Sequence, residues 1–320
     1  MAIHPKIKEV AVKFEAQELH AARSGREVME ALASVVAGSS AASIDDLAAE
    51  LALNAEALLE VMPAYAPPIN VLHRVFARLE RAQRDALPVS DFREAIAREA
   101  GAYRQWSEQA RSKIALYATR VIPDGGVVFT FTLSETVMGA LREAARRGVE
   151  FRVLVTESRP NADGTMTARS LAEQGIRVEV GIDAGVGELV ARADVMLVGA
   201  EAVLADGSAI CKVGTYPAAL VARRSGIPVY VLVDSMKVHS PSLLGKLPAL
   251  EPLAAKDVLG DGTAPQAPVV GHIFDCTPAD LISALVTERG LIHPRQVSQW
   301  MLEMPMSESL AIRPAGRQGA

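Results

Sequence analysis

The sequence predicts an α/β protein in which an N-terminal helical domain precedes a domain built on a parallel sheet. Residues 3–120 carry apolar side chains at helical spacing and show no strand pattern. From residue 127 onward, short apolar runs alternate with helical patterns, which is typical of parallel strands joined by right-handed helical crossovers. The turn sequence Pro-Asp-Gly-Gly at residues 123–126 separates the two patterns. We therefore expect a helical domain over residues 1–122 and an α/β domain over residues 123–320.

Local signals mark the helices of the first domain. The apolar residues between Ile7 and Phe14 recur at helical spacing. Ser43 opens the sequence Ser-Ile-Asp-Asp, which resembles a capping box because the serine hydroxyl can accept a hydrogen bond from the first helical turn. Ser90 is a suitable N-cap for a long helix that ends near Ala118.

In the second domain, short apolar runs predict strands and amphipathic segments predict helices. We expect strands over residues 127–132, 151–156, 177–181, 195–198 and 228–233. We expect helices over residues 134–148, 167–174, 187–193, 217–225 and 277–288. The run Val195–Val198 is apolar throughout, which favours a strand buried on both faces of a parallel sheet. This order of elements predicts a Rossmann-like domain.

Charge, hydropathy and cysteine content indicate which partners and which cellular compartment to expect. The formal net charge is −5 and the pI is about 5.8, so we expect no basic face for nucleic acid. No stretch approaches the roughly 20 apolar residues of a membrane span, and Met1–Ala22 carries charges of both signs, unlike a signal peptide. Cys211 and Cys276 are the only cysteines and lack metal-type spacing. We expect a cytoplasmic protein with free thiols that holds no metal or cofactor and binds neither nucleic acid nor membranes.

Several well-known signatures are absent from the sequence. There is no G-x-x-x-x-G-K-[ST] phosphate loop. The pair Gly185 and Gly187 lacks the third glycine of a dinucleotide fingerprint. There is also no HExxH, GxSxG or paired CxxC. Function therefore has to be inferred from single residues at the expected strand ends.

The segment after the strand Val195–Val198 contains a set of residues suited to a phosphorylated ligand. Glu201 follows the strand end, and Lys212 precedes the sequence Gly214-Thr215 at the start of a helical pattern. In open α/β sheets, ligands bind outside the carboxyl ends of the strands. A carboxylate, a lysine and a glycine turn ahead of a helix can together hold a sugar or nucleotide phosphate.

Four segments of the α/β domain resemble one known family. They are TLSETVMGAL from Thr132, TESRPNADGTMTARSLAEQGI from Thr156, VGAEAVLADGSAICKVGTYPAALVARRSGIPVYVL from Val198 and FDCTPADLISALVTERG from Phe274. Together they resemble the family of the alpha, beta and delta subunits of translation initiation factor 2B. That family also contains methylthioribose-1-phosphate isomerase and ribose-1,5-bisphosphate isomerase. Several motifs in one order are more specific than any one of them.

The resemblance implies two catalytic positions. The isomerases of the family carry a cysteine after the first sheet strand and an aspartate in a V-G-A-D motif; Thr132 and Glu201 stand at these positions. A threonine hydroxyl cannot replace a thiol as an acid or base near neutrality, whereas Glu201 keeps the carboxylate and moves it by about 1.5 Å. The alternative interpretations are a hydroxyl bonded to the backbone for Thr132 and a solvated or ion-paired carboxylate for Glu201.

The resemblance also implies a phosphate site. Arg159, in Ser-Arg-Pro, and Lys212, before the Gly-Thr turn, match phosphate-binding residues of the family, and we expect them to converge on one anion. Arginine supplies a planar fork and lysine a point charge. The backbone N–H groups of Gly214 and Thr215 add donors at the helix start. Arg23 matches an arginine-glycine loop in the helical domain of the family. The alternative is that Arg159 and Lys212 are solvated surface charges.

The two cysteines are candidate substitute nucleophiles. Cys276 directly precedes the helix expected over residues 277–288, and a helix N-terminus lowers the pKa of a thiol. A buried cysteine, however, is ordinarily a small apolar filler, and we favour that role for Cys211 and Cys276.

Three functions follow from the resemblance. The first is an initiation factor 2B-like protein that binds a phosphorylated sugar or nucleotide. The second is an aldose–ketose isomerase of a ribose-1-phosphate-type substrate, in which Glu201 moves a proton between C1 and C2 or polarises a hydroxyl. The third is a translation-factor-like regulatory scaffold subunit. The replacements at Thr132 and Glu201 disfavour the second, and the retained Arg159 and Lys212 disfavour the third. The resemblance further implies a homodimer formed through the α/β domain.

Overall fold

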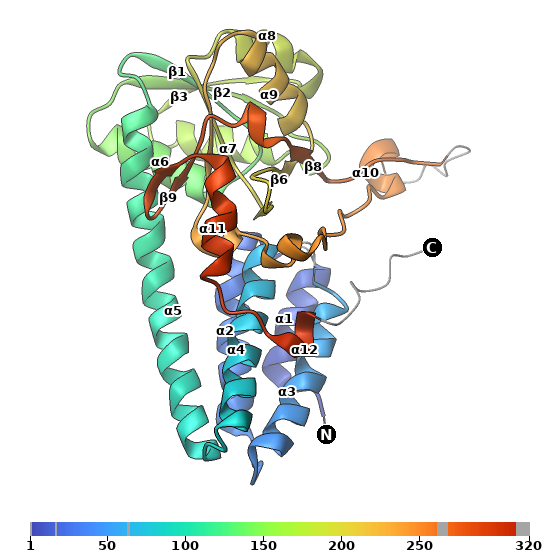
Figure 1. The fold of residues 1–320 in the computed structure, drawn as a ribbon. Coiled ribbons are helices and arrows are strands. Elements are labelled where there is room, and N and C mark those ends of the chain that lie inside the picture. Colours follow the sequence, from blue (N-terminus) through green and yellow to red (C-terminus); the bar gives the residue numbers. More distant parts are fainter. Residues whose placement is uncertain (1, 17, 63–64, 261–267, 312–320) are drawn as a thin grey trace. The chain divides into compact units, whose positions relative to one another are not determined.

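A computed structural model describes residues 2–16, 18–62, 65–260 and 268–311 of the chain. The chain divides into two compact units (Figure 1). The helical unit comprises Met1–Gln109, Met236–Ala249 and Gln299–Ala320, and the α/β unit comprises Ala110–Ser235 and Leu250–Ser298. This division differs from the one expected at residues 122 and 123, because the helical unit ends inside a long helix and takes in two later segments.

The helical unit is built from the helices expected over residues 3–120. They are α1 (Pro5–Glu15), α2 (Ala21–Gly38), α3 (Ile44–Leu59), α4 (Ala66–Arg84) and α5 (Val89–Ala118), whose last residues belong to the α/β unit; the short α12 (Glu308–Ala311) adds to the helical unit. The hydroxyl of Ser43 accepts a hydrogen bond from the Asp46 N–H at 3.1 Å, so the expected cap of α3 is present. The cap expected at Ser90 is wrong, because α5 already begins at Val89 and the Ser90 hydroxyl donates to Asp91.

Helix α4 explains why two late segments belong to the helical unit. The side-chain amide of Asn70 donates to the carbonyl oxygens of Met236 and Val238 at 2.7 and 2.6 Å. The Nδ1 atom of His73 accepts a hydrogen bond from the Ser307 N–H at 3.3 Å. Buried backbone groups need such partners, because an unpaired one costs about as much as a lost hydrogen bond. Polar side chains of one helix therefore hold segments more than 150 residues away in the chain.

The α/β unit contains a seven-stranded sheet with the order β10-β9-β7-β4-β1-β2-β3. Its strands are β1 (Gly126–Thr130), β2 (Phe151–Thr156), β3 (Arg177–Gly181), β4 (Val195–Gly199), β7 (Val229–Leu232), β9 (Ala284–Thr287) and β10 (Gly290–Ile292). All neighbours pair in parallel except β9 and β10. A helical region followed by a mostly parallel sheet confirms the predicted α/β class.

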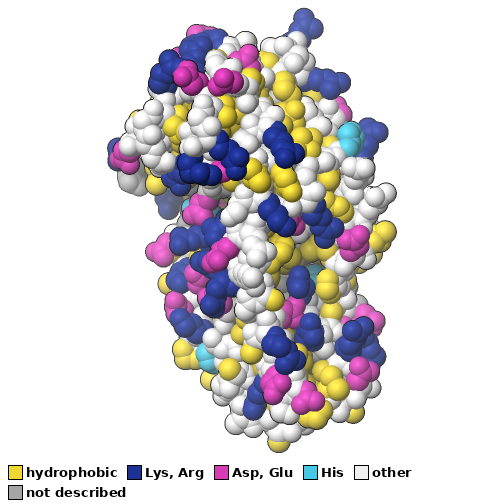
Figure 2. Space-filling model, turned by 90° about the vertical axis from the view of Figure 1, so that its left-hand side faces the viewer, with side chains coloured by type: hydrophobic (Ala, Val, Ile, Leu, Met, Phe, Trp, Pro, Cys, Tyr) yellow, Lys and Arg dark blue, Asp and Glu magenta, His cyan; other side chains and the backbone are white. Residues whose placement is uncertain are grey.

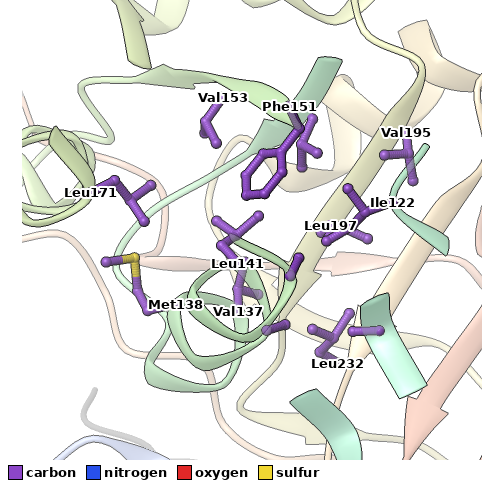
Figure 3. Close-up of a cluster of buried hydrophobic side chains, with 14 of the residues drawn as sticks. Ile122, Val137, Met138, Leu141, Phe151, Val153, Leu171, Val195, Leu197 and Leu232 are labelled. Atoms are coloured by element: carbon purple, nitrogen blue, oxygen red, sulfur yellow. The ribbon is translucent and has the colours of Figure 1, made fainter. Parts of the chain in front are cut away.

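Helices follow the strands, as expected for crossover connections. They are α6 (Glu135–Arg146), α7 (Asp163–Ala172), α8 (Val186–Ala191), α9 (Thr215–Arg224), α10 (Ala255–Leu259) and α11 (Val297–Leu302), the last of which extends into the helical unit. Figure 3 shows how α6 packs on the sheet: Val137 and Leu141 point toward Phe151, Val195 and Leu197. Burial of this apolar cluster stabilises the unit and keeps α6 fixed at the end of β1.

A second, three-stranded antiparallel sheet corrects one expectation. It has the order β5-β6-β8 and consists of β5 (Ala202–Val203), β6 (Ala209–Lys212) and β8 (Phe274–Thr277). The helix expected over residues 277–288 is therefore wrong. A 3₁₀ turn over Ala279–Leu281 follows β8, and the chain then continues as β9, which pairs with β7. Periodicity cannot separate a short apolar run in a buried strand from one in a helix, so the partner strand decides.

The surface carries mixed charge. On the face shown in Figure 2, Lys and Arg side chains lie among Asp and Glu side chains and exposed hydrophobic ones. No helix of the described residues is long and apolar enough to cross a membrane.

Two glycines within helices give a matched test of the packing. Gly164 is buried in α7, and an added Cβ there would overlap the carbonyl oxygen of Thr156 at the end of β2. Gly139 lies in α6 with nothing within 4 Å of an added Cβ. Gly164→Ala should lower the free energy of unfolding by about 3 kcal/mol, because β2 or α7 must shift. Gly139→Ala should raise it by up to about 1 kcal/mol through helix propensity.

Thermal melting of both variants beside the natural chain checks this pair. A Gly164→Ala protein that melts at the same temperature as the natural chain would show that α7 does not need this close approach.

Candidate functional site

The candidate site lies at the carboxyl end of β1, where the sheet order changes direction between β2 and β4. The chain runs from β1 to β2 on one side and later returns to β4 on the other, and ligands of open α/β sheets bind at the carboxyl ends of the strands at such a switch point. Thr132 follows β1, Arg159 follows β2 and Glu201 follows β4. An added Cβ on Gly199 would overlap the hydroxyl of Ser134, so the loops after β1 and β4 are in direct contact. The expected strand-end residues therefore share one edge of the sheet.

Thr132 is held in a left-handed backbone conformation, with φ of +61°. Its N–H donates to Ser158 Oγ at 2.8 Å, and its carbonyl oxygen accepts from Thr167 Oγ1 at 2.9 Å. Its own hydroxyl donates to Asp163 Oδ2 at 3.2 Å. A non-glycine residue adopts this conformation at a cost of roughly 1–3 kcal/mol, which these contacts offset. The hydroxyl is thus bonded to a carboxylate, in contrast to the backbone bonding of the alternative interpretation.

Asp163 is a site residue that the sequence analysis missed. It is the first residue of α7, and its Oδ2 atom lies 3.3 Å from Lys212 Nζ. The Lys212 side chain is 5% exposed and the Asp163 side chain 19% exposed, so this ion pair is largely withdrawn from water. Lys212 is therefore not a solvated surface lysine. The only signal in the sequence is an acidic residue just before Gly164, the glycine that lets α7 approach the end of β2.

Glu201 belongs to a row of side chains across the small sheet. Its N–H donates to the Ile210 carbonyl oxygen at 2.8 Å, and Ala202 pairs with Ile210, so Glu201 stands opposite Cys211. Cys211 in turn pairs with Asp275. Opposed residues of neighbouring strands point to the same face. The Oε2 atom of Glu201 is buried and has no hydrogen-bond partner among the described residues.

Asp275 holds the start of α9. Its Oδ2 atom accepts hydrogen bonds from the N–H groups of Gly214 at 2.8 Å and Tyr216 at 3.0 Å. Burial raises the pKa of Asp275 to about 6, although the two N–H donors act in the opposite direction. The Gly214 N–H, which we expected to bind phosphate, already has a carboxylate partner. The Thr215 hydroxyl donates to the Lys212 carbonyl oxygen at 2.7 Å, which fixes the turn between Lys212 and α9.

Gly214 is required by this turn. Its φ is +101°, and an added Cβ would lie 2.6 Å from the ring of Phe131, the residue before Thr132. The close approach of Gly214 and Phe131 brings the turn after β6 to the loop after β1. Thr132, Lys212 and Gly214 therefore belong to one neighbourhood.

Arg159 lies in an exposed loop whose backbone is fixed. Asp183 accepts hydrogen bonds from the N–H groups of Ser158 at 2.9 Å and Arg159 at 2.7 Å. The guanidinium of Arg159 donates to the Asp257 carbonyl oxygen at 3.1 Å. The loop of Arg159 leads into α7, whose first residue Asp163 is the partner of Lys212, and the convergence of Arg159 and Lys212 on one anion stays a prediction. Arg23 is exposed on α2 of the helical unit, on a helix and not in a loop.

Neither cysteine has the surroundings of a nucleophile. Burial raises the pKa of Cys211, and the nearby carboxylates of Asp275 and Glu201 raise it further. Cys276 is on the exposed edge of β8, and no α-helix begins beside it, so the expected lowering of its pKa is wrong; partial burial of the thiol raises this pKa. Within residues 2–311, where described, no three His, Cys, Asp or Glu side chains form a group that could hold a metal ion.

Relatives of the chain are isomerases and translation factors. The ribose 1,5-bisphosphate isomerase of Haloterrigena turkmenica is 31% identical over 314 residues, which cover 94% of each chain. The enzyme of that name from Thermococcus kodakarensis is 28% identical over 299 residues, covering 92% of this chain and 93% of the relative.

Solved structures share the fold. A translation initiation factor eIF-2B from Pyrococcus horikoshii matches with a TM-score of 0.75 and 24% identity, over 92% of this chain and 99% of the other. The 5-methylthioribose 1-phosphate isomerase from the same organism matches with a TM-score of 0.74 and 21% identity, over 93% and 87%. The model described as "Initiation factor 2 subunit family" matches residues 17–294. Given this extent and the isomerase relatives, the chain belongs to the initiation factor 2 subunit family.

Proposed function

We propose that the chain binds a phosphorylated sugar or nucleotide at the carboxyl ends of β1 and β4. The observation that carries this proposal is Lys212, whose side chain is 5% exposed and which lies at the end of β6 beside the Thr132 loop. A buried charge is costly unless it has a partner of opposite charge, and such a position is more often functional than a surface lysine is. The relatives named for ribose 1,5-bisphosphate favour a sugar phosphate over a nucleotide.

The residues at these strand ends suit the phosphate and the hydroxyl groups of such a ligand. The phosphate would bind Lys212 and the guanidinium of Arg159, which together supply a point charge and a planar fork. The buried, unpartnered Oε2 atom of Glu201 would accept a hydrogen bond from a sugar hydroxyl. Arg23 belongs to the helical unit, and its contribution rests on the family resemblance alone.

The second candidate function is an aldose–ketose isomerase, and Glu201 favours it. A carboxylate oxygen that is buried and lacks a hydrogen-bond partner among the described residues can accept a proton from the substrate and return it. In this reaction Glu201 would move a proton between C1 and C2 of the sugar. Thr132 would position the substrate or Asp163 through its hydroxyl, since a threonine hydroxyl does not titrate near neutrality.

Loss of the Lys212 charge tests ligand binding. Lys212→Ala should weaken binding by about 1.5–3 kcal/mol, because one charge-assisted contact to the phosphate is lost. Calorimetric titration with ribose 1,5-bisphosphate and with a nucleoside monophosphate measures this change. Lys113→Ala, which removes an exposed charge from α5, is the matched control and should bind as the natural chain does. Equal affinity of the Lys212→Ala and natural proteins would reject the site, and no binding by the natural chain would favour the scaffold function.

Replacement of Glu201 separates catalysis from binding. Glu201→Gln keeps the shape and removes the carboxylate that would take up the proton, so turnover should fall by about two to four powers of ten with little change in affinity. Magnetic resonance of the aldose and ketose signals measures turnover, and Glu188→Gln on the exposed side of α8 is the control. Undiminished turnover in Glu201→Gln would mean that another residue transfers the proton. Binding without turnover by the natural chain would leave the binding function alone.

We further propose, from the family resemblance, that the chain forms a homodimer through its α/β unit. Light scattering at micromolar concentration should then report about twice the chain mass of 34.0 kDa. A mass equal to one chain at that concentration would contradict the dimer.

A further inference from the structure

Both anion-binding elements of the proposed site already hold a carboxylate of the chain itself. Asp163 Oδ2 lies 3.3 Å from the Lys212 ammonium. Asp275 Oδ2 accepts hydrogen bonds from the Gly214 and Tyr216 N–H groups at the start of α9. An entering phosphate therefore meets two occupied positions, and the question is which carboxylate it can replace.

The two carboxylates are held in different ways. Asp275 is part of β8, paired in register with Cys211, and two backbone N–H groups of a helix start converge on one of its oxygens. Removing it would leave those donors unpaired. Asp163 is held through side chains only, by the Thr132 hydroxyl at 3.2 Å and the Lys212 ammonium at 3.3 Å. Its side chain is 19% exposed, so water and solutes reach it.

Charge makes simultaneous occupation costly. Lys212 and Asp163 together are neutral, so a phosphate dianion that enters beside the intact pair meets a like charge at short range. Repulsion between such charges is several times stronger in a largely buried site than in water. The Lys212 ammonium can pair fully with the phosphate only when the Asp163 carboxylate moves away from it.

We infer that Asp163 is an internal anion that occupies the Lys212 subsite in the free chain and is replaced by the phosphate of the ligand. Asp163 then determines affinity: it keeps the ammonium paired when the ligand is absent, and it competes with the phosphate when the ligand is present. This inference rests on the proposed function, since it concerns the same site. It also assigns the phosphate to Lys212 rather than to the N–H groups of α9, which Asp275 retains.

Asp163→Asn tests the competition directly. Asparagine has nearly the same size, can still accept the hydrogen bond of Thr132, and carries no charge. The variant should bind inorganic phosphate and ribose 1,5-bisphosphate about tenfold more tightly, the order of magnitude of one charge-assisted contact. Glu173→Gln removes the same charge from an exposed position at the other end of α7 and should leave both affinities unchanged. Calorimetric titration at fixed pH and ionic strength measures all three proteins.

The double variant Asp163→Asn with Lys212→Met shows whether the increase in phosphate affinity depends on the Lys212 ammonium. Both charges of the buried pair are then absent, so neither partner is left alone. Compared with Lys212→Met, the double variant should show no tightening. A tenfold gain that persists without Lys212 would overturn the inference, because the effect would then come from general loss of negative charge.

The outcomes separate this inference from the proposed function. Tighter binding of both probes by Asp163→Asn supports the inference, and it does so even if the natural chain binds neither probe, in which case the proposed function fails for the natural chain. Binding by the natural chain with no gain in Asp163→Asn overturns the inference and leaves the proposed function intact. A weaker affinity for ribose 1,5-bisphosphate with unchanged affinity for phosphate also overturns it, since Asp163 would then accept a sugar hydroxyl. Absence of binding in every variant rejects both.

Discussion

Parallel pairing of β1 with β2 on one side and β4 on the other is the constraint on which the candidate site depends. Backbone groups of a buried strand must be paired, so the registers Val128 with Val153 and Val128 with Val195 fix where all three strands end. The loops that carry Thr132, Arg159 and Glu201 then begin at one edge of the sheet. The apolar cluster beneath α6 keeps β1 and the start of α6 together. Site geometry is thus a consequence of how the sheet satisfies its hydrogen bonds and buries its faces.

Electrostatic compensation is the second feature that shapes the site. Charged side chains withdrawn from water need partners, and here each candidate anion-binding element has one from the chain itself. Lys212 is paired with Asp163, and the N–H groups at the start of α9 are paired with Asp275. By contrast, the Oε2 atom of Glu201 and the second carboxylate oxygen of Asp275, Oδ1, are buried without a hydrogen-bond partner among the described residues. A buried oxygen without a hydrogen-bond partner destabilises the folded chain, so a ligand that donates a hydrogen bond to it would be favoured.

Two candidate site residues differ from those that the resemblance to the isomerases of the initiation factor 2 subunit family leads one to expect. Relatives named as ribose 1,5-bisphosphate isomerases match over nearly the whole chain, while Thr132 and Glu201 stand where the resemblance places a cysteine and an aspartate. The Thr132 hydroxyl is hydrogen-bonded to Asp163, which links the first of these positions to Lys212 through one carboxylate. The residue at position 132 therefore contacts the same carboxylate oxygen that is paired with Lys212.

The sequence by itself determined the α/β class, the helical region before the sheet, the strands β1, β2, β3, β4 and β7, and the strand-end positions of Thr132, Arg159 and Glu201. Those features follow from local periodicity and turn residues, which report on each segment alone. Only the tertiary structure decided that residues 284–287 form a strand, because the parallel partner β7 overrides an ambiguous apolar run. It alone showed that Asp163 and Asp275 hold Lys212 and the start of α9, because these contacts join residues 49 and 61 positions apart. Such pairings arise from sheet order and burial, and no local pattern in the chain encodes them.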